Sequence, residues 1–289
     1  MDGDLERVTE ALHSTLDPRI SNATRQQALR YLEETRTQYN APQYGFSLAN
    51  DASQSSAVRY YGLQLLEYAV RYRWARYEAE QAEIRDWVIR LSGTITCHDE
   101  LFFRNKIAQL WVEVAKRCWG EGWMDMDKLL VTLWERADEG LTFKLFVLYV
   151  LELLSEDICN REDAAAGLRL EVLGSALNGI MVPEAIYSGS VEARTKGLRY
   201  GKEGWLRRVG DFIVLAIRNV RRGNDPLRVA EDAALKAFNA FRPTMVSQPL
   251  LLHVHGSFAS SLPLRACGRD WWVVPSTYAN LISCRHGSV

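Results

Sequence analysis

Apolar residues recur at steps of three and four along most of the chain, and the clearest run lies between Leu101 and Trp123. On a helix of 3.6 residues per turn these positions fall on one face, with charged and amide residues on the other. Either His98 or Asp99 is placed to cap the start of this helix, and Gly120 to end it. The pattern predicts an amphipathic helix that needs partners. Its apolar positions are Phe103, Ile107, Leu110, Trp111, Val114 and Cys118.

The same periodicity predicts further helices on both sides of this stretch. Short polar turns, such as Asp17-Pro18 and residues 50–55, join most of them into antiparallel hairpins, whereas residues 183–201 are expected to form a loop. Strand alternation is rare before Phe241, so the predicted fold class is all-α. The expected helices are 4–16, 22–34, 44–49, 56–74, 77–91, 126–134, 141–158, 164–181, 205–220 and 226–241.

The second helices of the hairpins resemble one another. Each has a basic residue, a small or apolar residue three positions later and an apolar residue seven positions later. The spacing is close to that of two-helix repeats, which predicts an α-α superhelix (a HEAT/ARM-like solenoid) of about five to six hairpins. The alternative is that any amphipathic helix produces such matches. The sets are Arg25/Ala28/Leu32, Arg59/Gly62/Leu66, Arg104/Ile107/Trp111, Lys144/Val147/Leu151 and Arg207/Gly210/Val214.

Composition narrows the class of protein. The formal net charge is -1, which argues against a nucleic-acid binder that relies on overall positive charge, although a basic groove is compatible with it. The five cysteines show no pairing pattern, so we expect reduced thiols in a nuclear or cytosolic setting. No window of 18 apolar residues occurs, and we expect no membrane insertion.

Motifs for enzymatic chemistry are lacking. The sequence has no glycine-rich phosphate loop, nucleophile elbow or zincin motif. The residues His253, His255, Cys267 and Cys284 fit no standard zinc spacing. We therefore expect neither an enzyme nor a bound metal or cofactor, and the functional surface is expected to bind macromolecules.

Four stretches carry a family resemblance. RNKIAQLWVEVAKRCWGEGW (104–123) resembles the exportin-1-like domain of the importin-β superfamily, and three others resemble repeats of its exportin-five branch, in the fungal form. The chain departs from the family where Gly120 and Met124 follow two tryptophans that usually precede proline, and it is far shorter than such receptors. The other stretches are AVRYYGLQLLEYAVRYRW (57–74), FVLYVLELLSEDI (146–158) and TRQQALRYLEE (24–34).

The resemblance implies three regions. Residues 1–95 would form N-terminal importin-β-like HEAT repeats, and residues 96–242 exportin-1-like HEAT repeats. Residues 243–289 show neither helical periodicity nor family similarity, and they would form an irregular C-terminal tail. A shifted reading frame, a retained intron or a truncated gene model would produce such a tail, as would a natural short isoform.

The function implied is that of a fragment of a nuclear export receptor, or karyopherin, that shuttles between nucleus and cytoplasm. Its partners would be Ran-GTP, nuclear pore proteins and an export cargo, either a phosphorylated protein or a structured RNA. In the superfamily, the second helices of the first repeats bind Ran-GTP. The other hypothesis is a truncated α-solenoid that acts as a scaffold without transport activity. The alternative for each of the candidates is an ordinary polar face of an amphipathic helix. The candidate Ran-binding residues are Arg30, Glu33, Glu34, Gln64, Glu67, Arg71, Gln109, Glu113 and Lys116.

Aromatic residues pose a separate question. Six tryptophans between residues 74 and 134 are expected to pack between the hairpins, because large aromatic side chains bury much area. Arginine and tyrosine interleaved near residues 59–77 can stack on RNA bases. We favour the other interpretation, in which these side chains wrap a helix end. The set comprises Arg59, Arg71, Arg73, Arg76, Tyr60, Tyr61, Tyr72 and Tyr77.

Overall fold

The computed structural model describes residues 2–159, 164–184 and 197–221. All of them belong to the first of two units, Met1–Val246 and Ser247–Val289. The expected helix at 226–241, the tail and the zinc-like set lie outside the described residues. Within these residues the regular structure is helical, apart from one isolated bridge between Trp119 and Trp123. The predicted all-α class is confirmed.

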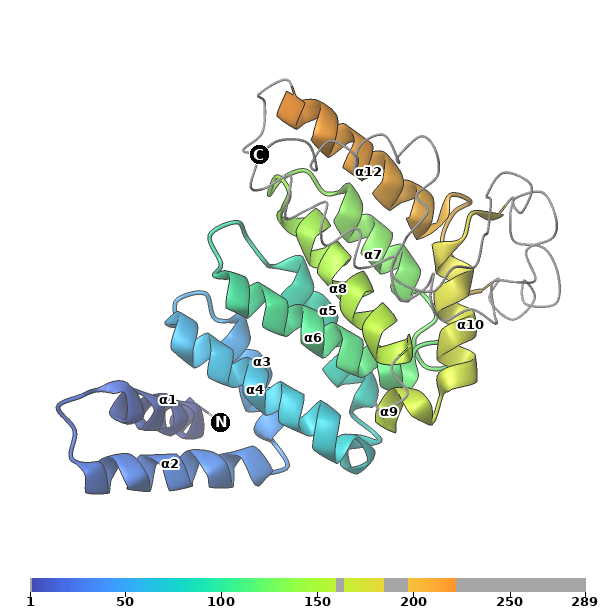
Figure 1. Ribbon diagram of the computed structural model, residues 1–289. Helices are drawn as coiled ribbons and strands as arrows, with labels where there is room; N and C mark the ends of the chain where they lie inside the picture. The colour runs from blue at the N-terminus through green and yellow to red at the C-terminus, as the bar shows by residue number, and fades with distance from the viewer. Residues whose placement is uncertain (1, 160–163, 185–196, 222–289) are drawn as a thin grey trace, which may run out of the picture. The chain divides into compact units, whose positions relative to one another are not determined.

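The helices follow the predicted order (Figure 1). Four pairs, α1–α2, α3–α4, α5–α6 and α7–α8, consist of helices that pack directly on each other, and α10 packs on α12. The described helices are α1 (Asp2–Leu16), α2 (Asn22–Thr37), α3 (Ala41–Asn50), α4 (Ser56–Arg73), the 3-10 helix η1 (Trp74–Tyr77), α5 (Gln81–Gly93), α6 (Leu101–Cys118), α7 (Met126–Glu135), α8 (Thr142–Cys159), α9 (Ala164–Gly167), α10 (Leu170–Met181) and α12 (Gly204–Arg221).

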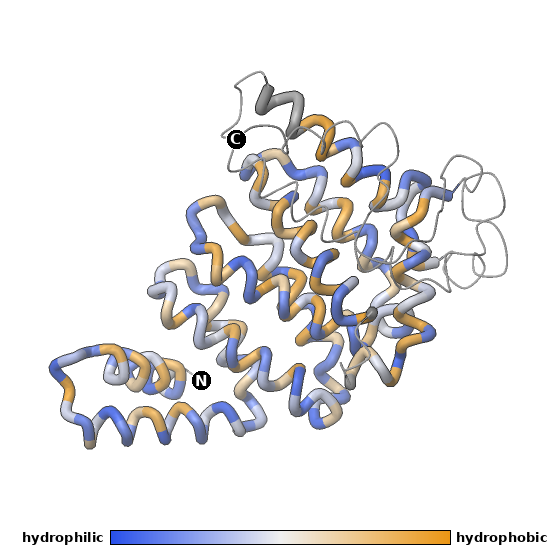
Figure 2. The backbone as a smooth tube through the Cα atoms, in the orientation of Figure 1, coloured by the Kyte–Doolittle hydropathy of each residue, from blue (hydrophilic) through white to orange (hydrophobic). Residues whose placement is uncertain are grey.

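The pairs stack in one direction. Helix α4 packs against α6 and α6 against α8, so the second helices of successive pairs lie side by side, and α3 packs against α5 in the row of first helices. Polar and apolar residues alternate along each helix, as Figure 2 shows, because every helix buries one face against its neighbours. This is the arrangement of a HEAT-like solenoid.

Local sequence explains most helix ends. Ser21 caps α2 by accepting a hydrogen bond from the Thr24 amide, and Ser55 caps α4 by accepting one from the Val58 amide. The cap expected for α6 is wrong. Glu100 holds that position without a side-chain bond, while the Asp99 carboxylate accepts from the Thr96 amide and pairs with Arg59 at 2.7 Å.

Two other boundaries differ from the prediction. The helix expected to begin at Tyr77 begins at Gln81, because residues 74–77 form the 3-10 helix η1. The helix expected over residues 164–181 is divided into α9 and α10 near Arg169, whose guanidinium donates to the carbonyls of α6 and its C-cap. The break between α9 and α10 therefore lies at the residue whose side chain bonds to the end of α6.

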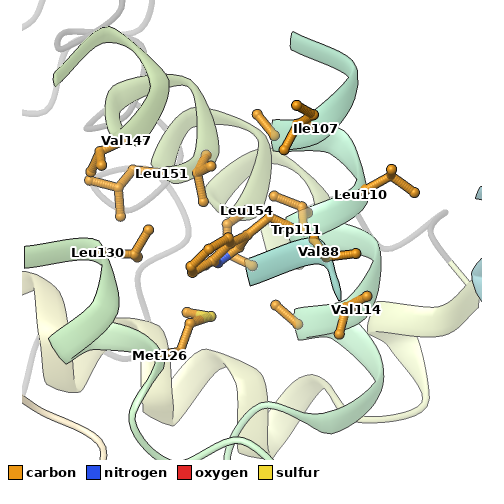
Figure 3. Packing of buried hydrophobic residues seen from close by; sticks show 14 of the residues in the cluster. Val88, Ile107, Leu110, Trp111, Val114, Met126, Leu130, Val147, Leu151 and Leu154 are labelled. Atoms are coloured by element: carbon orange, nitrogen blue, oxygen red, sulfur yellow. The ribbon is translucent and has the colours of Figure 1, made fainter. Parts of the chain in front are cut away.

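Most buried side chains form one continuous core. Trp111, Trp119 and Trp123 are almost fully buried, and the ring centroids of Trp111 and Trp123 lie 4.9 Å apart. Figure 3 shows Trp111 of α6 facing Leu130 of α7 and Leu151 of α8. The expected role of the tryptophans is confirmed, since the six of them lie in this core or pack against it. A smaller core, including Val8, Leu12 and Leu32, joins the first hairpin to the second.

Three basic residues of the repeat pattern each hold a hairpin together at one end. Arg25 donates to the carbonyl of Asp17 after α1, Arg59 to that of Ala49 in α3, and Lys144 to that of Trp134 in α7. Each bond satisfies a helix C-terminal carbonyl that has no partner within its own helix. At the end of α5 this role falls to Arg136, whose Nη1 lies 2.7 Å from the Gly93 carbonyl oxygen.

A buried carboxyl group ties α7 to the last described pair. Asp127 is 2% exposed, and it accepts hydrogen bonds from the indole Nε1 of Trp205 at 2.6 Å and from the Tyr200 amide at 2.5 Å. Burial raises the pKa of Asp127 to about 6, even though both hydrogen bonds favour the charged form. The folded state therefore holds this proton more tightly than the unfolded state.

The pH dependence of stability tests this arrangement. Because the folded pKa lies above the unfolded one, the contribution of Asp127 is largest below pH 4 and is lost as the pH rises through 6. Relative to an Asp127→Asn variant, the chain is expected to gain up to roughly 3 kcal/mol in unfolding free energy between pH 7 and pH 4. Urea unfolding of both proteins across that range measures the difference, in which other carboxylates cancel. A constant difference would contradict the raised pKa.

Candidate partner-binding face

The nine candidate residues lie on three second helices, α2, α4 and α6. Arg30, Glu33 and Glu34 of α2 are exposed, and Glu33 forms an ion pair with Arg36 of the same helix at 2.6 Å. On α4, Gln64 is also exposed. These four side chains present polar and charged groups directly to solvent.

Glu67 and Arg71 lie one turn apart at the junction of α4 and α6. The Glu67 carboxylate accepts from Arg71 at 3.3 Å and pairs with Lys106 of α6 at 2.5 Å. Arg71 also reaches Glu113, with an Nε to Oε1 distance of 3.5 Å. Burial alone would lower the pKa of Arg71, but the charges of Glu113 and Glu67 raise it overall.

Glu113 and Lys116 of α6 are buried, in contrast to their expected position on a polar face. Lys116 is 1% exposed, and its Nζ lies 2.9 Å from Glu113 and 2.7 Å from Asp157 of α8. Glu113 also accepts from Arg117 at 2.7 Å. The third residue on this helix, Gln109, is half-buried.

These contacts form an ion-pair relay that crosses three second helices in succession. We call it the relay, and it comprises Glu67, Arg71, Lys106, Glu113, Lys116, Arg117 and Asp157. Three members of the relay, Lys106, Arg117 and Asp157, are not among the candidates that the sequence indicates. The structure thus brings together four of the candidates on α4 and α6, which are Glu67, Arg71, Glu113 and Lys116, whereas the candidates on α2 are not members of the relay.

The interleaved arginines and tyrosines divide into packing and surface groups. Tyr61 donates its hydroxyl to the Leu32 carbonyl at 2.9 Å, and burial raises its pKa. Tyr77 donates to the Gln38 carbonyl and stacks against Tyr39 at 5.3 Å. Tyr72 remains 66% exposed. Several of these side chains therefore join α2 to α4, in agreement with the packing interpretation.

Two other kinds of functional feature, a metal site and a membrane-spanning helix, were sought among the described residues. Within residues 2–159, 164–184 and 197–221, no group of three or more His, Cys, Asp or Glu side chains is arranged to hold a metal ion. None of the helices in these ranges has the length and apolarity that crossing a membrane requires. The candidate surface is a polar face on stacked helices.

Comparison with known proteins supplies the class. No family model matches the chain. The chain is 28% identical over 216 residues to Protein MSN5 of Saccharomyces cerevisiae. This alignment covers 69% of the chain and 17% of the relative. It is 28% identical to Exportin-5 of Dictyostelium discoideum, with 58% of the chain and 16% of the relative covered. Human Exportin-5 is 29% identical, with 53% and 13% covered.

The stacked helix pairs and these relatives together support the nuclear export receptor family, whose members are transport receptors and not enzymes. More particularly, the chain is exportin-5-like in sequence, which confirms the resemblance that its motifs carried. The chain spans only 17%, 16% and 13% of the length of the relatives described.

Proposed function

We propose that this chain is part of a nuclear export receptor, and that its exposed second-helix residues contact Ran in the GTP-bound form. The receptor would shuttle between nucleus and cytoplasm with its cargo and pass through the pore by binding nuclear pore proteins. The observation that carries the proposal is the similarity to two proteins named Exportin-5, combined with exposed charged residues on α2.

Burial decides which candidate residues are available to a partner. Arg30, Glu33, Glu34 and Gln64 need no rearrangement to make a contact. Glu67, Arg71, Glu113 and Lys116 already neutralise one another, so a partner would have to exchange existing ion pairs to reach them. We therefore propose that the α2 residues and Gln64 make first contact, and that they act through steering and specificity.

The first experiment compares nucleotide states. Binding of this polypeptide to Ran loaded with a non-hydrolysable GTP analogue and to Ran-GDP is measured by calorimetry. We expect the GTP form to bind at least about tenfold more tightly, which corresponds to ~1.4 kcal/mol. Equal binding, or none to either form, would favour the scaffold function.

Charge reversal locates the contact. A Glu33→Lys/Glu34→Lys variant is expected to bind Ran-GTP roughly five- to thirtyfold more weakly at low salt, since each exposed pair contributes about 0.5–1 kcal/mol. The matched control is Glu78→Lys/Glu83→Lys, which makes the same charge change at two exposed positions outside the second helices, one in the turn before α5 and one in α5. An equal loss in both variants would show a non-specific charge effect and remove α2 from the contact.

Charge reversal of two other candidate residues, Glu67 and Glu113, is a less direct test of the Ran contact. Both carboxylates pair with cations of a neighbouring helix or turn, so their reversal would also disturb the packing of α4 on α6. Any loss of binding in that variant must be compared with its unfolding free energy before it is attributed to a lost contact.

A further inference from the structure

Three arginines each donate to a backbone carbonyl near the C-terminal end of a second helix in an earlier hairpin. Arg76 of η1 donates to the Thr37 carbonyl in the last turn of α2, at 3.0 Å. Arg117 of α6 donates to the Arg71 carbonyl near the end of α4, at 3.2 Å. Arg169, which follows α9, donates to the Lys116 carbonyl of α6 at 3.0 Å. The ends of three consecutive second helices are thus bonded in the same way.

These bonds follow from the chemistry of helix ends. The last four carbonyls of a helix have no intrahelical donor, and the helix dipole places partial negative charge there. A guanidinium group offers a fixed charge and several donors in one plane, so it can serve two groups at once. Arg169 does so by also donating to the Trp119 carbonyl at 2.7 Å.

The sequence separations show what the bonds join. Arg76 and Thr37 are 39 residues apart, Arg117 and Arg71 are 46, and Arg169 and Lys116 are 53. Each separation is longer than one helical hairpin. Each bond therefore joins the second helix of one hairpin to a segment that comes later in the array. The bonds of Arg25, Arg59 and Lys144 at the opposite helix ends run within single hairpins instead.

We propose that Arg76, Arg117 and Arg169 act as staples that set the angles between the hairpins that they join. The first, second and fourth hairpins are each stiffened internally by Arg25, Arg59 or Lys144, so loss of a staple frees a junction without unfolding these hairpins. The staple between α4 and α6 is itself held in place, because Arg117 also donates to the carboxylate of Glu113 at 2.7 Å. This inference does not depend on the proposed Ran contact.

Distances between hairpins test the staples. Spin labels carried by keto amino acids, which avoid the native cysteines, are introduced at the exposed residues Gln27 of α2 and Glu83 of α5. In an Arg76→Gln/Arg117→Gln double variant of the full chain, we expect the distance distribution between the labels to shift or broaden clearly. Far-UV circular dichroism should stay unchanged, and Tm should fall by about 2–4 °C per staple.

Two comparisons make the test decisive. Arg73→Gln is the control, because Arg73 is exposed and donates within α4 to the Tyr68 hydroxyl, so its loss should leave the distribution unchanged. A lower Tm with an unaltered distribution in the double variant would reduce the arginines to ordinary helix caps and overturn the proposal. If the double variant does not fold, the single variants Arg76→Gln and Arg117→Gln are measured, and unaltered distributions in both overturn it equally.

Discussion

A Gly62→Ala substitution is expected to lower the unfolding free energy by about 2–4 kcal/mol, despite the better helix propensity of alanine. Gly62 lies where α4 crosses α3. A methyl group there would approach the Gly45 carbonyl oxygen at 2.5 Å and the Ala49 amide nitrogen at 2.8 Å. Both are backbone atoms, so relief requires the two helices to move apart, which would open the core around Leu66. Chemical denaturation of the variant measures the loss.

The matched control for this prediction is Gly93→Ala. Gly93 is the last residue of α5, and a methyl group added there meets nothing within 4 Å. We expect this change to be neutral or to stabilise the chain by up to about 1 kcal/mol, since alanine loses less backbone entropy on folding than glycine does. A Gly62→Ala variant as stable as Gly93→Ala would mean that α3 and α4 do not approach each other this closely.

The contrast between these glycines shows where periodicity is informative. The repeat pattern marks position 62 as small and position 66 as apolar, and both residues are buried at the predicted interface. Periodicity identifies the buried face of a helix because burial follows the helical repeat. It does not show that Gly62 touches a backbone 17 residues earlier, because closeness of that kind depends on the crossing of two helices.

The same reasoning explains why the candidate face was only partly predictable. Helix α6 packs against α4, α5 and α8, so neighbours on both sides cover part of its polar face. Helix α2 belongs to the first hairpin of the described array. No described hairpin precedes it, and its residues Glu33 and Glu34 are exposed. Identical sequence patterns therefore give exposed charges in the first hairpin and buried ion pairs in the third.

Ion pairs between residues of different hairpins could not be predicted from the sequence either. Asp99 looked like a cap for α6, yet its partner is Arg59, 40 residues away. Lys116 pairs with Glu113 on its own helix, but its other partner, Asp157, lies 41 residues further along in the next hairpin. Both pairs join residues about one repeat apart in the sequence. Only the packing of the hairpins shows which charged residues of neighbouring repeats come into contact.

Removal of the buried cation at the centre of the relay is expected to have the second large effect. A Lys116→Met variant should lose about 2–4 kcal/mol of unfolding free energy, because the change leaves Glu113 and Asp157 with fewer cationic partners in a desolvated site. Glu113 keeps Arg117 and Arg71, which holds the loss below that of a completely unpaired buried charge. Methionine preserves most of the side-chain volume, so the loss reports charge more than packing.

Two further measurements separate this effect from a general change in surface charge. Glu33→Gln removes the exposed pair with Arg36, where Glu33 is 64% exposed, and it should change stability by less than about 1 kcal/mol at low salt and hardly at all near 1 M salt. A double-mutant cycle of Lys116→Met with Glu113→Gln should give a coupling energy of about 1–3 kcal/mol that persists in salt. Strict additivity of the two changes would contradict the relay, and Glu113 and Lys116 would then be available to a partner after all.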